Sequence, residues 1–212
     1  MKRPLRLGLF AATILVCVTA SAQSQITGSV TTTAEVSGDA SSTHHAIDVV
    51  TTVSSGWTTT TRQWGLSGVA WAEAWDQPCW FLLYRASLDG GHQDLAGTVW
   101  DVPGCAKTTA GSYKDVVSGE TNLFVSSVKI CTTDKSGTKD NKLKGIELQF
   151  VKVTDGVVSA VVKTRHEQRS NCSWWRNRVS CPSQQIAVGM DFQYGDKGVM
   201  GIKLRCSRVE DV

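Results

Sequence analysis

Short runs of alternating apolar and polar residues recur along the chain, and they predict β-strands throughout. In the clearest run, Ile186, Val188, Met190 and Phe192 alternate with small or polar residues. A two-residue period turns one set of side chains toward a core and the other set away from it, which is typical of a strand. No segment carries a long helical period, so the sequence predicts an all-β fold.

The strand patterns form a unit that occurs three times. In each unit a strand-like stretch leads through a polar loop with Gly and Asp into a second strand. The second strands lie at 95–100, 143–150 and 199–206. Their glycines Gly97, Gly145 and Gly201 are 48 and 56 residues apart. Three units of similar length predict a pseudo-threefold arrangement.

Two N-terminal segments differ from the rest of the chain. Residues 1–22 contain three basic residues, an apolar run and the small residues Ala20-Ser21-Ala22, which predicts a secretory signal peptide cleaved after Ala22. Residues 23–60 are rich in Ser and Thr, and their pattern leaves a partly ordered strand region and a loose arm both open. We therefore expect an exported protein whose three-repeat β domain covers residues 61–212.

The charge balance argues against nucleic acid and membrane surfaces as partners. The chain has 22 basic and 19 acidic residues. Lys2, Arg3 and Arg6 lie in the predicted signal peptide, which leaves 22 − 3 = 19 basic residues against 19 acidic ones. A neutral chain has no bulk attraction to polyanions. No later apolar run approaches the 18 residues of a membrane helix, so no stable membrane insertion is expected.

Six cysteines follow the predicted signal peptide, and an even number in an exported chain predicts three disulfides. Six cysteines allow fifteen pairings. The repeat favours one of them, because one pair flanks the first unit, another flanks the third, and two cysteines remain. The resulting pairs are Cys79–Cys105, Cys181–Cys206 and Cys131–Cys172.

The last repeat resembles the vitelline membrane outer layer protein family. The similar features are Trp175, Cys181-Pro182, the alternating strand 186–192, Gly195-Asp196 and the strand 201–206. The resemblance extends over residues 64–208 and weakens toward the N-terminus. It implies a β-prism of three sheets with internal threefold symmetry, in a secreted coat protein associated with glycan binding. A β-trefoil is the second architecture, and a pair of immunoglobulin-like sandwiches is the third.

The resemblance is incomplete at the loops. The family carries paired acids there, whereas this chain has Asp140-Asn141 and Asp196-Lys197. A shared acidic site therefore loses support.

An aromatic and basic segment is the favoured ligand surface. It contains Trp174, Trp175, Arg176 and Arg178. Neighbouring side chains on a strand point to opposite faces, so one indole is expected to be exposed, where it can stack on a sugar ring. The five tryptophans between residues 57 and 80 are mostly expected in the core.

A basic stretch precedes this segment, and with its two arginines it forms a six-residue cluster. The cluster consists of Lys163, Arg165, His166, Arg169, Arg176 and Arg178. It could recognise sulfated or sialylated glycans, or it could be a solvated loop.

Three loop acids, Asp94, Asp140 and Asp196, are expected at equivalent positions of the repeat. Carboxylates accept hydrogen bonds from sugar hydroxyls, but Asp in Gly-rich loops also caps its own turn. No motif predicts a metal site or a cofactor, and none is expected.

Three classes of function follow from these features. The leading hypothesis is a secreted, disulfide-stabilised protein that binds extracellular glycans or glycoproteins, or forms part of a coat. The alternatives are a carbohydrate-active enzyme, with Glu73, Glu120 and Glu147 among its candidate acids, and a toxin or effector that contacts a host surface. The absence of a recognised catalytic motif favours a non-enzymatic function.

Overall fold

The structure is a computed structural model that describes residues 24–49, 63–90, 93–105, 113–135, 141–196 and 198–211. These residues form fourteen strands and no helix. The prediction of an all-β fold is confirmed. The predicted signal peptide lies outside the described residues.

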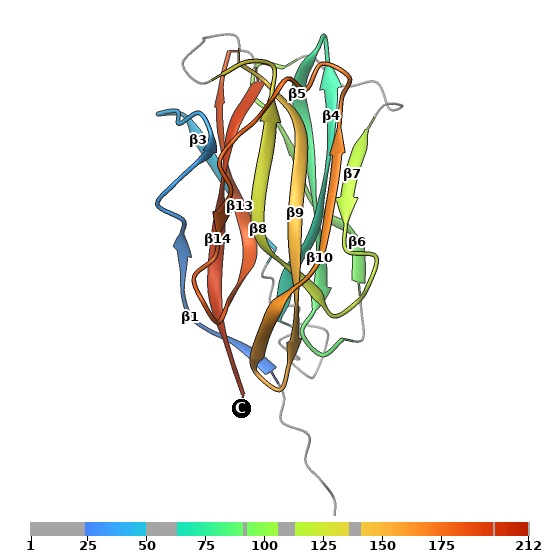
Figure 1. Cartoon of the computed structure of the whole chain (residues 1–212), viewed down its shortest axis with the longest axis vertical. Coiled ribbons are helices and arrows are strands. Elements are labelled where there is room, and N and C mark those ends of the chain that lie inside the picture. The colour runs from blue at the N-terminus through green and yellow to red at the C-terminus, as the bar shows by residue number, and fades with distance from the viewer. Residues whose placement is uncertain are drawn as a thin grey trace, which may run out of the picture.

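Three antiparallel sheets stand side by side around one interior (Figure 1). The first sheet has the order β6-β5-β4-β7, with β4 (Trp64–Ala74), β5 (Gln77–Ser87), β6 (Gln93–Asp101) and β7 (Lys114–Val117). The second has the order β10-β9-β8-β11, with β8 (Leu123–Thr132), β9 (Leu143–Thr154), β10 (Val157–Gln168) and β11 (Trp174–Trp175), and β12 (Val179–Ser180) also pairs with β8.

The third sheet joins strands from both ends of the chain. Its order is β1-β14-β13-β3, with β1 (Ser24–Thr32), β3 (His44–Asp48), β13 (Gln185–Gly195) and β14 (Gly198–Asp211), while β2 (Ser37–Gly38) pairs with β14. The described part of the Ser/Thr-rich segment therefore consists largely of strands and belongs to the prism.

A central hairpin lies in the middle of each sheet: β4–β5, β8–β9 and β13–β14. In the first two sheets, the second strand of the hairpin pairs with the next strand in the sequence, so β5 pairs with β6 and β9 pairs with β10. In the third sheet β14 pairs instead with β1. Three sheets related in this way form a β-prism, so the predicted pseudo-threefold architecture is confirmed. The turns of the central hairpins gather at the upper end in Figure 1, which we call the hairpin end.

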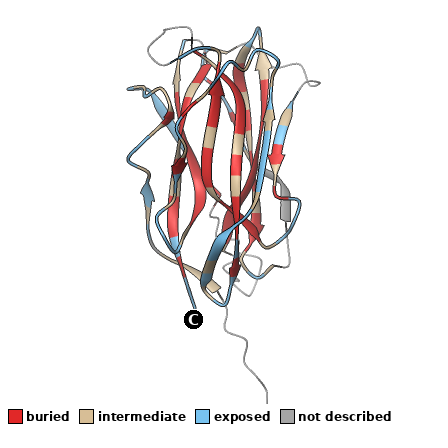
Figure 2. Cartoon of the chain, in the orientation of Figure 1, coloured by how far each residue is buried: buried red, intermediate tan, exposed pale blue. Residues whose placement is uncertain are grey.

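Side chains from all three sheets fill the interior. Phe81, Phe150 and Phe192 are fully buried in one cluster, and each comes from a different sheet. Burial of a large apolar side chain contributes roughly 1.5–3 kcal/mol, so this shared core holds the three sheets together. Figure 2 shows the central strands buried along most of their length, whereas β10 is largely exposed.

The alternating patterns behave differently on two strands. On β9, Ile146 and Leu148 are buried and Glu147 between them is partly exposed, as expected. On β13, a register shift between Ala187 and Gly189 interrupts the alternation, and even Asp191 is buried. The bulge moves the apolar set from one face to the other, so that Ile186 and Val188 join one buried cluster and Met190 and Phe192 join another. Because both faces are covered, strict alternation in the sequence did not give a half-buried strand here.

The first repeat is displaced by one strand from its predicted position. The expected pair, residues 80–84 with 95–100, does form, but it is β5 with β6. The central hairpin of that sheet is β4–β5, whose turn is Trp75-Asp76. Asp94 therefore lies on strand β6 and not in the turn equivalent to that of β13–β14.

The predicted disulfide pairing is confirmed. The bonds are Cys79–Cys105, Cys131–Cys172 and Cys181–Cys206.

Candidate functional site

The turn between β4 and β5 presents an unusual side chain to solvent. Trp75 and Asp76 form its two-residue loop and both have positive φ, 52° and 63°. Such loops favour Asn and Gly, because other residues meet steric strain there. Trp75 is nevertheless 87% exposed, so its indole gains almost nothing from packing. Neither packing nor backbone preference accounts for a tryptophan at this position, which makes Trp75 a candidate ligand contact.

A buried lysine fixes this turn to the neighbouring sheet. The Lys144 side chain, on β9, is fully buried. Its ammonium donates to Glu73 Oε1 at 2.9 Å, to the Asp76 carbonyl at 2.9 Å and to Asp76 Oδ1 at 2.6 Å. Three acceptors satisfy the three donors of an ammonium, which is the condition for burying such a charge.

The Asp76 carboxylate is held in its ionised form while remaining half exposed. The hydrogen bond from Lys144 lowers its pKa most, partial burial opposes this, and the hydrogen bond from Asn171 and the charges of Lys144 and Lys142 lower the pKa further. Its side chain is 55% exposed. At neutral pH an anionic acceptor therefore follows Trp75 directly in the turn.

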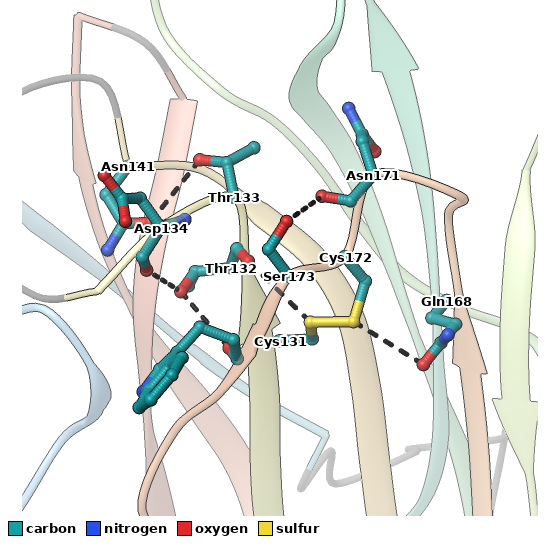
Figure 3. The surroundings of a disulfide bond; sticks show 10 residues. Cys131, Thr132, Thr133, Asp134, Asn141, Gln168, Asn171, Cys172 and Ser173 are labelled. Carbon is teal, nitrogen blue, oxygen red and sulfur yellow. Dashed lines mark hydrogen bonds between the residues drawn. A yellow bond between two sulfur atoms is a disulfide. The ribbon is translucent and has the colours of Figure 1, made fainter.

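The loop of residues 169–173, between β10 and β11, contacts the same turn. Asn171 Nδ2 donates to Asp76 Oδ1 at 3.1 Å. The Cys131–Cys172 disulfide anchors this loop beside β8, as Figure 3 shows for residues 171–173 next to Thr132. Trp174 follows the loop on β11 and is 45% exposed. We name the group of Trp75, Asp76, Asn171 and Trp174 the hairpin-end surface. Asp76 and Asn171 are in direct contact, and Trp174 belongs to the same end because it pairs with Thr132, the last residue of β8.

One face of Trp174 is already occupied. The Lys135 ammonium lies 4.5 Å from its ring centroid, within the range of a cation–π contact. Trp75 has no such contact among the described residues, so it is the more available of the two rings.

The predicted aromatic and basic segment does not act as one surface. Trp174 is exposed and Trp175 is partly buried, with the Lys129 ammonium 5.5 Å from its ring centroid. Arg176 is buried and binds Asp39 at 2.5 Å, and Arg178 binds Glu147. Both guanidinium groups are engaged inside the protein, and only Trp174 of the four enters the hairpin-end surface.

The three predicted loop acids are not brought together as equivalents. Asp196 is exposed in the β13–β14 turn, Asp94 lies on β6, and Asp140 lies outside the described residues. In the first sheet the residue that occupies the turn of the central hairpin is Asp76, which sequence reasoning missed.

The predicted basic cluster is largely neutralised. Its first four residues lie on or just after β10, where a solvated loop was the alternative. Within the described residues, four of the six cations are within 4 Å of a carboxylate. The pairs are Lys163–Glu120, Arg169–Glu73, Arg176–Asp39 and Arg178–Glu147. The candidate acids Glu73, Glu120 and Glu147 are therefore all paired with cations.

The fold is shared with plant lectins. The Calystegia sepium agglutinin aligns with a TM-score of 0.51 and 11% identity, covering 85% of this chain and 97% of its own. Jacalin aligns with a TM-score of 0.47 and 10% identity over 85% and 96% of the two chains. A mannose-specific jacalin-related lectin from Morus nigra, in complex with mannose, gives 0.44 and 14% over 86% and 99%.

The fold is a β-prism. At these identities the likeness shows the fold alone. No family model matches the chain, and no curated protein matches it either.

The described residues show neither a membrane-spanning helix nor a metal site. There is no helix among them that is long and apolar enough to cross a membrane. Nor do three or more His, Cys, Asp or Glu side chains gather there as a metal site.

Proposed function

We propose that this protein is a glycan-binding β-prism protein and that the hairpin-end surface carries its binding site. The exposed, strained Trp75 is the observation that carries the proposal. An indole face stacks on the apolar face of a sugar ring, while Asp76 and Asn171 supply an acceptor and a donor for its hydroxyls. The shared fold with an agglutinin supports this function.

The geometry favours shallow and weak single-site binding. Trp75 and Asp76 lie on a turn, Asn171 on a loop and Trp174 on the short strand β11, all at the surface, so they cover only one side of a ligand. Affinity for a free sugar is then modest, and useful binding depends on several sites engaging a glycan-coated surface together.

The test is the Trp75→Gly variant on a glycan array, followed by calorimetry with the best ligand. We expect at least a tenfold loss of affinity because the stacking surface is removed. Glycine adopts positive φ without strain, so the free energy of unfolding should stay the same or rise by up to about 1 kcal/mol. Loss of binding without loss of stability separates a ligand contact from a folding defect.

Tyr113→Ala is the matched control, because Tyr113 is also exposed, at 63%, but lies beside β7 outside the hairpin-end surface. It should bind glycans like the unmodified protein. Full binding by Trp75→Gly would place the site elsewhere, and a wild-type protein that binds no glycan would refute the function.

The proposal includes export and a place in an extracellular coat. Three disulfides form and persist mainly in oxidising compartments outside the cytosol, which agrees with the predicted signal peptide. The coat role and glycoprotein partners follow from the resemblance to the vitelline membrane outer layer family. Retention of the full-length chain inside the producing cell would contradict export.

A further inference from the structure

A seam runs between the first and second sheets, where their edge strands β7 and β10 lie next to each other (Figure 1). In the described ladders, β7 pairs with β4 and β10 pairs with β9. Side chains join the two edges instead. Lys163 Nζ donates to the Ser118 carbonyl at 2.7 Å and to Glu120 at 2.8 Å, and Lys114 lies 3.3 Å from Glu167.

A cleft of about 350 Å³ opens along this seam. Its lining consists of Asp115, Val116, Val117, Arg165, His166 and Glu167. A volume of this order accommodates a small ligand such as a monosaccharide. It is separate from the hairpin-end surface, with which it shares no residue.

Arg165 is the remaining guanidinium of the basic stretch. It stands opposite Leu148 in the β9 ladder, so its side chain leaves β10 on the face that turns toward the core and β7. Within the part of the chain that the structure describes, it forms no ion pair or hydrogen bond. The four neighbouring cations already described each pair with a carboxylate within 4 Å, whereas Arg165 acts on Glu120 through its charge alone. Its guanidinium donors therefore remain for a ligand.

Asp115 faces the same cleft from the other strand. It too forms no ion pair or hydrogen bond among the described residues, and it does not reach Arg165. Its charge is felt by the Tyr84 phenol, whose pKa is raised first by burial and then by Asp115 and Tyr113. The Arg165 guanidinium, a donor, and the Asp115 carboxylate, an acceptor, thus line one cavity without forming a hydrogen bond to each other.

We infer that the seam cleft binds a sugar that carries a single carboxylate, such as a hexuronic or sialic acid. The Arg165 guanidinium pairs with the ligand carboxylate, because its planar fork matches that group. Asp115 accepts a hydrogen bond from a ring hydroxyl, whereas the His166 ring lies on the other face of β10 against Trp175 and takes no part. Val117 contacts the apolar part of the ring.

The charges around the seam limit the ligand to one anionic group. Lys114, Lys163 and Arg165 are balanced by the acids Asp115, Glu120 and Glu167. With no net positive field, a polysulfated chain gains no general attraction and meets repulsion from Asp115 and Glu167. The cleft therefore selects a carboxylated sugar and not a polyanion.

The experiment is calorimetry on the intact oxidised protein with two pairs of probes, each an acidic sugar and a neutral counterpart that lacks the carboxylate or the whole sialic acid residue. The pairs are glucuronate with glucose, and 3′-sialyllactose with lactose. We expect the acidic member of at least one pair to bind about tenfold more tightly or better, as a charge-assisted contact requires. Which pair shows the difference identifies the uronic or the sialic acid as the preferred ligand.

Arg165→Ala should remove this preference and leave binding of the neutral probes unchanged. Arg208→Ala is the matched control, because Arg208 is an exposed arginine on the third sheet, and it should keep the preference. A preference that survives in Arg165→Ala, equal binding of acidic and neutral probes, or much tighter binding of a heparin tetrasaccharide would each overturn the inference.

Trp75→Gly distinguishes the two proposals. It should lose the array ligand of the hairpin-end surface and still prefer the acidic probe. The seam inference can therefore fail while the proposed function stands, and the reverse also holds.

Discussion

Replacement of Lys144 by Met should lower the free energy of unfolding by about 3 kcal/mol or more. Removal of one partner from a buried ion pair leaves the other charge uncompensated, which typically costs about 3–5 kcal/mol. Glu73, whose side chain is only 13% exposed, would then keep only the Arg169 guanidinium, 3.9 Å away, as a partner. Urea unfolding followed by tryptophan fluorescence measures the change.

Acidification provides an independent check on the same contact. The folded-state pKa of Asp76 is lowered below its usual value of 3.8, so its contribution to stability is present above that value and is lost as pH falls through the folded pKa. The gap in stability between wild type and Lys144→Met should therefore narrow below about pH 4.

Lys142→Met is the control for this prediction. Lys142 makes a single contact at 3.5 Å to the same carboxylate, which is 55% exposed, and its own side chain is 17% exposed against 0% for Lys144. Its removal should therefore change the free energy of unfolding by less than about 1 kcal/mol. Equal effects of the two variants would show that burial of Lys144 does not determine its role.

Loss of the Cys131–Cys172 disulfide should lower the free energy of unfolding by an amount comparable to that of the Lys144→Met variant. The bond closes a loop with a sequence separation of 41, and the loop-closure entropy of the unfolded chain corresponds to about 4 kcal/mol. The bond also fixes residues 171–173 beside β8, so Asn171 and Trp174 should lose their positions in the hairpin-end surface. A Cys131→Ala, Cys172→Ala double variant should therefore lose both stability and glycan affinity.

A variant without the Cys181–Cys206 bond is the control that separates the loss of stability from the loss of glycan affinity. The bond's sequence separation of 25 predicts a loss of about 3.5 kcal/mol, but the bond does not hold any loop of the hairpin-end surface. The variant without it should keep its glycan affinity at a temperature where it is folded. Equal loss of affinity in both variants would refute a local role for the Cys131–Cys172 bond.

Local sequence patterns predicted the strands with regular alternation and missed one turn. Ile146, Leu148 and Phe150 on β9 obey the two-residue period, and this strand was recognised. The turn of Asp155-Gly156 has a typical hairpin dipeptide, whereas Trp75-Asp76 does not. Without a turn signal, β4 and β5 could not be recognised as a hairpin, and the first repeat was displaced by one strand.

The candidate site depends on contacts between residues far apart in sequence. Alternation is a local property, so one indole of Trp174 and Trp175 was expected at the surface, and the structure shows that it is Trp174. The burial of Lys144 depends on Glu73 and Asp76, which are 71 and 68 residues away. Arg176 is paired with Asp39, 137 residues away, so no local pattern could show that this arginine was unavailable to a ligand.

The composition of the third sheet affects how the molecule can be assembled. The first and second sheets each contain consecutive strands. In the third sheet, β1, β2 and β3 can pair only after β13 and β14 have been synthesised, and these strands come more than 130 residues later. A chain that emerges from its N-terminus completes two sheets before the third has its central hairpin. Truncation at either end would remove strands from the same sheet and leave one wall of the prism open.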